Sequence, residues 1–273
     1  MDGKKIAGRI LEDLRREIGH LGKQLRLAIV VVGADPAVSA FIEQKKKAAK
    51  EVGIDTRVYP FEETITTNEL RKRIADITHE RINSGVIIQL PLPAHINRQY
   101  ILNSVTPEKD VDVLSARAIG NFAVGKHLVM PPVVGAVELL LRVYDVDYGT
   151  KRIVVLGAGN LVGKPIAMWL LHLGATFSVI RSSTDRPTAY TREADIIITG
   201  IGKPGYVTAE MIKEGVVLVD AGTSESDGKM VGDVDAKSVE KKVALLSPVP
   251  GGVGPVAVAM VLKNLVTLAA RKQ

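Results

Sequence analysis

Hydrophobic positions along the chain show two patterns, a helical spacing and short continuous apolar runs. Ile6, Ile10, Leu14 and Ile18 recur at four-residue steps, which predicts a helix with one apolar face. Short β-branched runs then alternate with amphipathic stretches. We therefore expect a strand at 27–33, a helix at 36–52, a strand at 56–59, a helix at 68–82 and a strand at 85–90.

The second half of the chain repeats this alternation after an irregular stretch. Residues 91–135 show no clear period, and the pair Pro131-Pro132 marks a hinge. A helical stretch begins near Gly135, and the strand-like runs RIVVLG, TFSVIR, ADIIITG and VVLVDAG follow. Such alternation is typical of α/β proteins with mainly parallel sheets, so we predict two α/β lobes that meet near residue 134.

Composition agrees with two ordinary domains in a soluble globular chain. The 273 residues are 46% apolar and 24% charged. The absence of cysteine excludes disulfides, Cys-ligated metal sites and a thiol nucleophile, and favours a reducing compartment, so we expect a cytoplasmic protein. The N-terminal segment is charged throughout and has no apolar core of a secretory signal.

Charge and aromatic content narrow the choice of partners. The net charge of +6 suits anionic ligands, but only 4% of the residues are aromatic, which supplies few rings for stacking on nucleic-acid bases. The uncharged stretch 243–262 nominally reaches membrane-spanning length, yet three prolines and three glycines interrupt it. We therefore expect no nucleic acid and no membrane as partner.

The strand at 152–157 runs into a glycine turn that can hold a phosphate. Gly157, Gly159 and Gly163 precede a helix, whose N-terminal N–H groups and dipole attract anions. The spacing is one residue longer than the usual dinucleotide fingerprint, and a tight strand-to-helix turn without a ligand has the same pattern. The next strand ends at Arg181 and Ser182, where an NAD site would carry an acidic residue, so a 2′-phosphate and hence NADP are favoured over NAD. A solvated Arg181 is the alternative.

One lysine lies on the apolar face of its predicted helix. Asp35-Pro36 is a helix start signal, and Lys45 falls within the stripe that contains Phe41 and Ile42. Loss of hydration would lower the pKa of such a lysine, allowing acid or base chemistry near neutral pH, although a stem lying on the stripe with its ammonium in water is the ordinary alternative. Gln89 ends an apolar strand, and Asp110 and Asp112 follow in the loop PEKDVD, where they are turn formers or acceptors for a heterocycle.

Six motifs in sequence order give the chain a family resemblance. PAVSAFIEQKKKAAKEVGI, GVIIQLPLPAHIN, PEKDVD, GAGNLVGKPIA, GKPG and PVPGGVGP span residues 36–255 and closely resemble the bifunctional methylenetetrahydrofolate dehydrogenase/cyclohydrolase family. The resemblance implies NADP-dependent oxidation of methylenetetrahydrofolate and hydrolysis of the resulting methenyltetrahydrofolate to formyltetrahydrofolate. It also implies a homodimer, a folate-binding catalytic domain at 1–134 onto which helix 255–273 packs back, a Rossmann-like NADP domain at 135–254, and a cleft between them.

The resemblance also implies roles for individual residues. Lys45 matches the catalytic lysine, Gln89 the glutamine that tunes it, and Asp112 the aspartate that anchors the pterin. Phe41 replaces a tyrosine that stacks on folate, and Val113 stands where glycine follows the second aspartate. The implied substrate contacts also include Pro250, Gly251 and Gly252, and the implied cofactor contacts are Gly157, Ala158, Gly159, Arg181, Ser182 and Thr223.

Two other functions are compatible with parts of the pattern. Another two-lobed NADP oxidoreductase, acting on a hydroxy acid or a ketone, would need a Lys–Asp or His acid–base pair and leaves QLPLP unexplained. A non-catalytic dinucleotide sensor or a basic nucleic-acid-binding module is the alternative outside enzymes, and binding to DNA would then depend steeply on salt.

Overall fold

A computed structural model of the chain describes residues 1–33, 36–226 and 229–271. The chain folds into two compact units. The N-terminal unit contains Gly8–Pro132 and the chain from Val258 onward, and the central unit contains Met1–Ala7 and Val133–Ala257. The break at 132/133 lies close to the boundary expected near 134, whereas the first seven residues group with the central unit rather than with the segment that follows them.

The N-terminal unit is built on a small parallel sheet. Its three strands lie in the order β2-β1-β3, so β1 is central and pairs in parallel with both neighbours. The predicted β-α-β-α-β order is present, with each boundary within four residues of its expected position. The elements are α1 (Gly3–Leu21), of which only the part from Gly8 onward groups with this unit, β1 (Arg26–Val32), α2 (Pro36–Glu51), β2 (Asp55–Phe61), α3 (Thr67–His79) and β3 (Gly85–Ile88).

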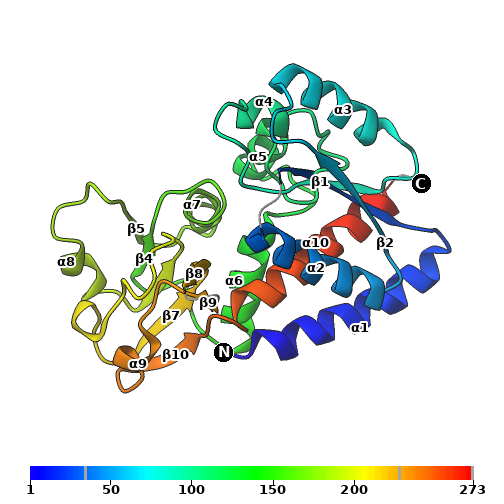
Figure 1. Cartoon of the computed structure of the whole chain (residues 1–273). Coiled ribbons are helices and arrows are strands. Elements are labelled where there is room, and N and C mark those ends of the chain that lie inside the picture. Colours follow the sequence, from blue (N-terminus) through cyan, green and yellow to red (C-terminus); the bar gives the residue numbers. More distant parts are fainter. Residues whose placement is uncertain (34–35, 227–228, 272–273) are drawn as a thin grey trace. The chain divides into compact units, whose positions relative to one another are not determined.

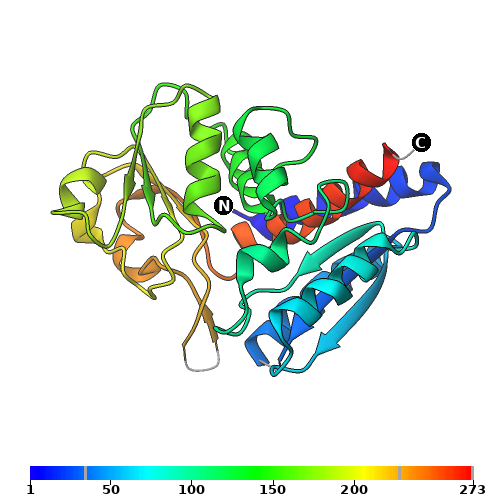
Figure 2. The same ribbon diagram turned by 90° about the horizontal axis from the view of Figure 1, so that it is seen from above.

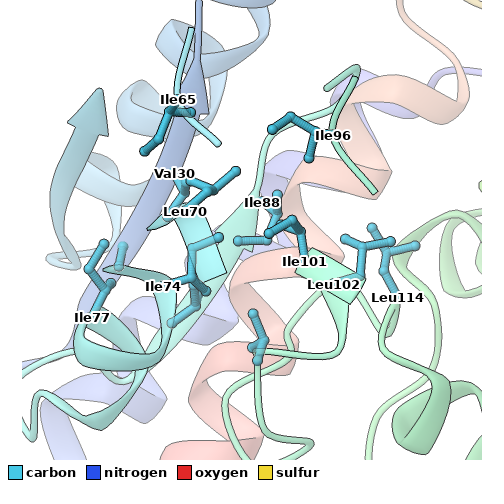
Figure 3. Close-up of a cluster of buried hydrophobic side chains, with 13 residues drawn as sticks. Val30, Ile65, Leu70, Ile74, Ile77, Ile88, Ile96, Ile101, Leu102 and Leu114 are labelled. Atoms are coloured by element: carbon cyan, nitrogen blue, oxygen red, sulfur yellow. The ribbon is translucent and has the colours of Figure 1, made fainter. Parts of the chain in front are cut away.

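Helices cover both faces of this sheet. Figure 1 shows α3 on one side of β1 and β2, and α2 on the other. The α3 face is closed by apolar side chains at helical spacing, Leu70, Ile74 and Ile77, which pack against Val30 and Ile88 of the strands (Figure 3). Because β1 and β3 are covered on both faces, they are nearly continuous apolar runs rather than alternating ones.

The segment expected to be irregular contains two short helices. α4 (Arg98–Leu102) is capped by the Asn97 side chain, which accepts the Tyr100 N–H at 3.1 Å, and α5 (Ala116–Ala123) is capped by Ser115. The expectation of no regular structure over 91–135 was wrong here, because caps start helices too short to show a period. α6 (Pro132–Val143) begins at the second proline of the expected hinge, a residue that suits a first helical turn.

The central unit is a doubly wound parallel sheet. Its strands are β4 (Ile153–Leu156), β5 (Phe177–Ile180), β6 (Ile196–Thr199), β7 (Val216–Asp220) and β10 (Val243–Ser247). They lie in the order β10-β7-β6-β4-β5, and all neighbours are parallel. The strand order therefore reverses between β4 and β6, and in such sheets ligands bind beyond the carboxyl ends of the strands at that point. The first four strands confirm the predicted Rossmann-like α/β pattern.

Several smaller elements of the central unit were not predicted. β10 comes from VALLS, and β8 (Ser224–Ser226) pairs with β9 (Lys229–Val231) in an antiparallel ribbon. α8 (Pro187–Thr191), α9 (Ala236–Val239) and the 3-10 turn Ala209–Met211 lie in the connections, whereas α7 (Gly163–His172) is the helix predicted after the glycine turn.

The last helix, α10 (Val253–Ala270), is apolar and long enough to cross a membrane by length and composition. In this structure 61% of it is buried within the protein, as expected for a core helix. It runs alongside α1 in both views (Figures 1 and 2). Its buried Asn264 donates two hydrogen bonds from Nδ2, to the carbonyls of Val111 at 2.8 Å and Met130 at 2.9 Å, and thereby ties the helix to both ends of the 111–130 segment.

Replacing Asn264 with leucine should destabilise the N-terminal unit. The change keeps a side chain of similar size but leaves two carbonyl groups without their partner, at a cost of about 1–3 kcal/mol each when they stay buried. Thermal unfolding followed by circular dichroism should begin several degrees lower. Lys263→Ala, at the exposed neighbouring position, is the control and should leave the transition in place. An unchanged transition in Asn264→Leu would show that these bonds contribute nothing.

Candidate active site

α2 presents Lys45 from the edge of its apolar face. Ile42 and Ala49 of that face are buried, whereas Phe41, Lys45 and Ala48 are partly exposed. Asp35, the expected start signal of this helix, lies outside the described residues. The structure thus confirms the helix and places Lys45 at the edge of the buried stripe rather than within it.

Gln89 fixes the lysine head group. It follows β3 at the carboxyl edge of the parallel sheet, and its backbone N–H still bonds to the Val30 carbonyl at 2.9 Å. Its Nε2 donates to the Leu90 carbonyl at 3.0 Å, so its Oε1 faces away from that bond and accepts the Lys45 Nζ at 2.8 Å. Because both ends of the amide have partners, Gln89 holds the ammonium in one direction rather than merely capping the loop.

The loop 110–115 brings Asp112 close to this lysine. The buried Asp110 carboxylate accepts the backbone N–H groups of Leu114, at 3.1 Å to Oδ2, and Ser115, at 2.8 Å, and so organises the turn. Val113 adopts φ +56°, a left-handed conformation that a β-branched residue rarely takes. A glycine at this position would have no such strain, but Val113 is 98% buried and its packing offsets part of the cost. Asp110 is therefore the turn former, which leaves Asp112 free to face a ligand.

Burial shifts the pKa values of Lys45 and Asp112 toward neutral pH. Loss of hydration lowers the pKa of the Lys45 ammonium, and the neighbouring Asp112 charge partly offsets this effect. Loss of hydration raises the pKa of Asp112 to about 6, with Lys45 opposing the rise and Asp110 adding to it. A lysine of lowered pKa beside a carboxyl group that titrates near pH 6 is suited to acid–base catalysis.

The remaining residues predicted to contact substrate come from two segments of the chain. Phe41 lies one helical turn before Lys45 on α2. Pro250, Gly251 and Gly252 belong to the central unit, in the loop that precedes α10. Gly251 has φ +111°, and a Cβ on Gly252 would lie 2.6 Å from the Pro248 carbonyl oxygen, so both positions need glycine for a tight turn.

The glycine turn of the central unit lies at the point where the strand order reverses. Gly157 follows β4 with φ +105°, and a Cβ there would lie 2.9 Å from the Gly200 carbonyl oxygen after β6. Gly163 opens α7, and a Cβ on it would overlap the Gly157 carbonyl oxygen at 2.0 Å. At Gly159, in contrast, a Cβ would meet nothing within 4 Å. The turn is therefore compact on its protein side and open at Gly159, as a dinucleotide phosphate requires.

The other predicted cofactor residues occupy the same edge of the sheet. Ala158 is partly exposed within the turn, and Arg181 and Ser182 are exposed directly after β5. The Arg181 backbone N–H donates to Thr184 Oγ1 at 2.9 Å, which holds that loop in a turn. Thr223 is exposed just after β7. The three loops that follow β4, β5 and β7 thus carry all the predicted cofactor residues.

Sequence reasoning missed two buried carboxylates at this edge. Asp220 ends β7 and Asp233 follows the β8–β9 ribbon; both are at least 98% buried. The one available signal was an acidic residue closing the apolar run VVLV, because a buried carboxylate must have partners.

Comparisons with known proteins agree with this geometry. The catalytic-domain model of tetrahydrofolate dehydrogenase/cyclohydrolase matches residues 1–112, and the NAD(P)-binding-domain model of the same family matches residues 131–273. The bifunctional protein FolD of Nautilia profundicola is 40% identical over 98% of this chain and 96% of its own length.

Solved structures show the same similarity. The bifunctional enzyme FolD from Campylobacter jejuni, a methylenetetrahydrofolate dehydrogenase/cyclohydrolase, superposes with a TM-score of 0.94 at 39% identity, covering 100% of this chain and 98% of that one. The Trypanosoma brucei FolD, solved with NADP cofactor and inhibitor, has a TM-score of 0.95 at 32% identity, covering 100% and 97%. With both family models matched in order and full-length relatives near 40% identity, the chain belongs to the tetrahydrofolate dehydrogenase/cyclohydrolase family.

Proposed function

We propose that this chain oxidises methylenetetrahydrofolate to methenyltetrahydrofolate with NADP and then hydrolyses that product to formyltetrahydrofolate. The observation that carries the proposal is the 2.8 Å bond from Lys45 Nζ to Gln89 Oε1, in a group that also contains Asp112. A hydroxy-acid dehydrogenase or a nucleotide sensor would not require this group, and the full-length family match favours folate chemistry over both.

The oxidation makes modest demands on the side chains. A hydride leaves a carbon between two nitrogens, and a nitrogen lone pair stabilises the cation that remains, so positioning is the main requirement. NADP, when bound, supplies the hydride acceptor. In our proposal the Asp112 carboxylate accepts N–H groups of the pterin, and Phe41 lies against its ring. Gly159 leaves room for the dinucleotide phosphates, and Arg181 and Ser182 bind the 2′-phosphate.

The hydrolysis requires proton transfer, which we assign to Lys45. Water adds to the methenyl carbon and loses a proton, and a ring nitrogen must gain a proton as its bond to that carbon breaks. A neutral amine at Lys45 accepts the first proton, and the resulting ammonium donates it to the ring nitrogen. The remaining hydroxyl proton of the adduct leaves to water as the formyl C=O forms, so hydrolysis of the cationic methenyl group releases one proton overall. Gln89 holds Nζ in place through its Oε1, and burial lowers the lysine pKa, which favours the neutral amine that the first step needs.

We further propose that the protein is a homodimer in the cytoplasm, within the folate one-carbon metabolism that supplies purine and amino-acid biosynthesis. The absence of cysteine supports the compartment, and the family resemblance supports the dimer.

The direct test of the proposed function mixes the protein with tetrahydrofolate, formaldehyde and either NADP or NAD. Absorbance should report reduced nucleotide and a transient methenyltetrahydrofolate, faster with NADP. Arg181→Ala should lower kcat/KM for NADP about 10- to 100-fold, because a charge-assisted bond to the 2′-phosphate is lost, and leave the rate with NAD unchanged. Arg186→Asn is a matched control: Arg186 is exposed in the same loop, and asparagine tolerates its φ of +47°. Equal losses with both nucleotides would contradict the assignment.

Lys45→Met should reduce the hydrolysis of methenyltetrahydrofolate by at least about 100-fold, because proton transfer by a positioned group contributes that much or more. Methionine keeps the apolar stem without the amine, so the oxidation should fall far less. Lys47→Met, on the exposed side of the same helix, should hydrolyse at the parental rate. A Lys45→Met enzyme with full cyclohydrolase activity would overturn the role of this lysine.

The pH dependence of the oxidation should follow the ionisation of Asp112. Its pKa of about 6 means that the carboxyl is protonated below pH 6 and charged above it, and the charged form is the better acceptor for pterin N–H groups. In the oxidation, kcat/KM for the folate should therefore rise up to tenfold per pH unit below pH 6 and level off above it. In Asp112→Asn this rise should disappear. A profile with the same rise in the variant would assign the titration to another group.

A further inference from the structure

The Asp233 carboxylate holds the chain segment that leaves β6. Its Oδ2 accepts the Thr199 hydroxyl and the Ile201 backbone N–H, both at 2.8 Å, and its Oδ1 accepts the Lys203 backbone N–H at 2.8 Å. Asp233 itself is completely buried, so it touches no ligand. It reaches across 30 residues or more of sequence to fix one loop by three hydrogen bonds.

A second carboxylate fixes the first. Asp220 Oδ1 accepts the backbone N–H groups of Gly222 at 2.9 Å and Asp233 at 3.2 Å, and its Oδ2 accepts the Val234 N–H at 2.9 Å. The same side chain thereby sets the backbone of Asp233 and the residue before Thr223. The two carboxylates form one network that holds the loops after β6 and β7.

Two glycines leave the space that these carboxylates occupy. A Cβ on Gly222 would lie 2.3 Å from the Asp233 Cγ, and one on Gly232 would lie 2.1 Å from the Asp220 Oδ2. Burying two acids close together is costly: loss of hydration and the Asp233 charge raise the pKa of Asp220 to about 6, against its three hydrogen bonds. Two apolar residues in place of the carboxylates would stabilise this region at lower cost. The network therefore indicates that the loops after β6 and β7 need a fixed backbone conformation.

The loop held by Asp233 lies where a dinucleotide crosses the sheet. It follows β6, next to β4 on the side away from β5, and the strand order reverses between β4 and β6. It also packs on the glycine turn, since a Cβ on Gly157 would lie 2.9 Å from the Gly200 carbonyl oxygen and one on Gly200 would lie 2.5 Å from Val162 Cγ1. Arg181, which follows β5, lies on the opposite side of β4. The sheet order therefore places the adenosine half of the dinucleotide toward β5 and the nicotinamide half toward the loop after β6.

We propose that Asp233 is a positioning residue that fixes the loop Gly200–Gly205 against the nicotinamide half of NADP, with Asp220 holding Asp233 in place. This inference rests on the proposed NADP-dependent oxidation. It assigns a role in dinucleotide binding to a residue that makes no contact with the dinucleotide.

The test compares NADP with 2′,5′-ADP, which carries the adenosine half and the 2′-phosphate but no nicotinamide. Two variants loosen the network: Asp233→Asn replaces one acceptor oxygen with a donor, and Thr199→Val removes one donor from a fully buried side chain with almost no change in shape. Thr191→Val is the matched control, because Thr191 is equally buried in the same unit and its hydroxyl bonds within α8 at 3.5 Å.

Calorimetric titration should show Kd for NADP raised about tenfold in Asp233→Asn and by a smaller factor in Thr199→Val, as expected for loss of bonds to a charged group. Kd for 2′,5′-ADP should stay within about twofold of the parental value in both variants. Thr191→Val should bind both ligands as the parent does.

Hydrolysis of methenyltetrahydrofolate without nucleotide is measured alongside and should be unchanged, which shows that the rest of the protein is folded. Equal weakening of NADP and 2′,5′-ADP, or parental NADP binding in both variants, would overturn the role of Asp233. If Asp233→Asn does not fold, Thr199→Val alone decides between these outcomes. Failure of the parental protein to bind NADP would instead contradict the proposed function.

Discussion

The hydrogen bond between Lys45 and Gln89 is the contact on which the catalytic arrangement depends. A lysine on the edge of an apolar helix face has many rotamers, and water would normally draw its ammonium outward. Here the amide of Gln89, itself tied to the Leu90 carbonyl, gives the head group one position at the carboxyl edge of a parallel sheet. Partial burial then lowers the lysine pKa, and Asp112 supplies the charge that limits this effect. Position and proton affinity are thus set by the same few residues.

The two units use their parallel sheets in a similar way. In both, polar side chains gather where strands end, because that edge of a parallel sheet exposes loops over a rigid base. In the N-terminal unit the loops carry Gln89 and Asp112, which lie close to Lys45 of α2. In the central unit the loops carry glycines, and buried carboxylates set the backbone. The N-terminal unit thus supplies reactive side chains, as a proton transfer requires. The central unit supplies a fixed backbone surface, as the positioning for a hydride transfer requires.

Much of this could be predicted from sequence, and the failures have physical causes. The strands at Leu27 and Ile153 are long apolar runs, and the α2 stripe is wide enough to show that Lys45 is out of place. α4 and α5 were missed because side-chain caps, rather than periodicity, start them. The Lys45–Gln89 bond joins positions 44 residues apart, so spacing alone could suggest two candidates but not their contact. The role of Asp233 could not be predicted for the same reason: its partners lie 30 or more residues earlier in the sequence, and no neighbouring residue indicates that it is buried.

The tie between Asn264 and the carbonyls of Val111 and Met130 has a consequence for how the polypeptide matures. The N-terminal unit is discontinuous, and α10 fills part of its interior only after the whole central unit has been synthesised. A nascent chain on the ribosome therefore carries residues 8–132 with an open core while the central unit, continuous apart from seven residues, has all its strands and can fold first. Domains generally fold in order from the N-terminus during translation, whereas this topology allows the central unit to complete its core before the N-terminal unit does.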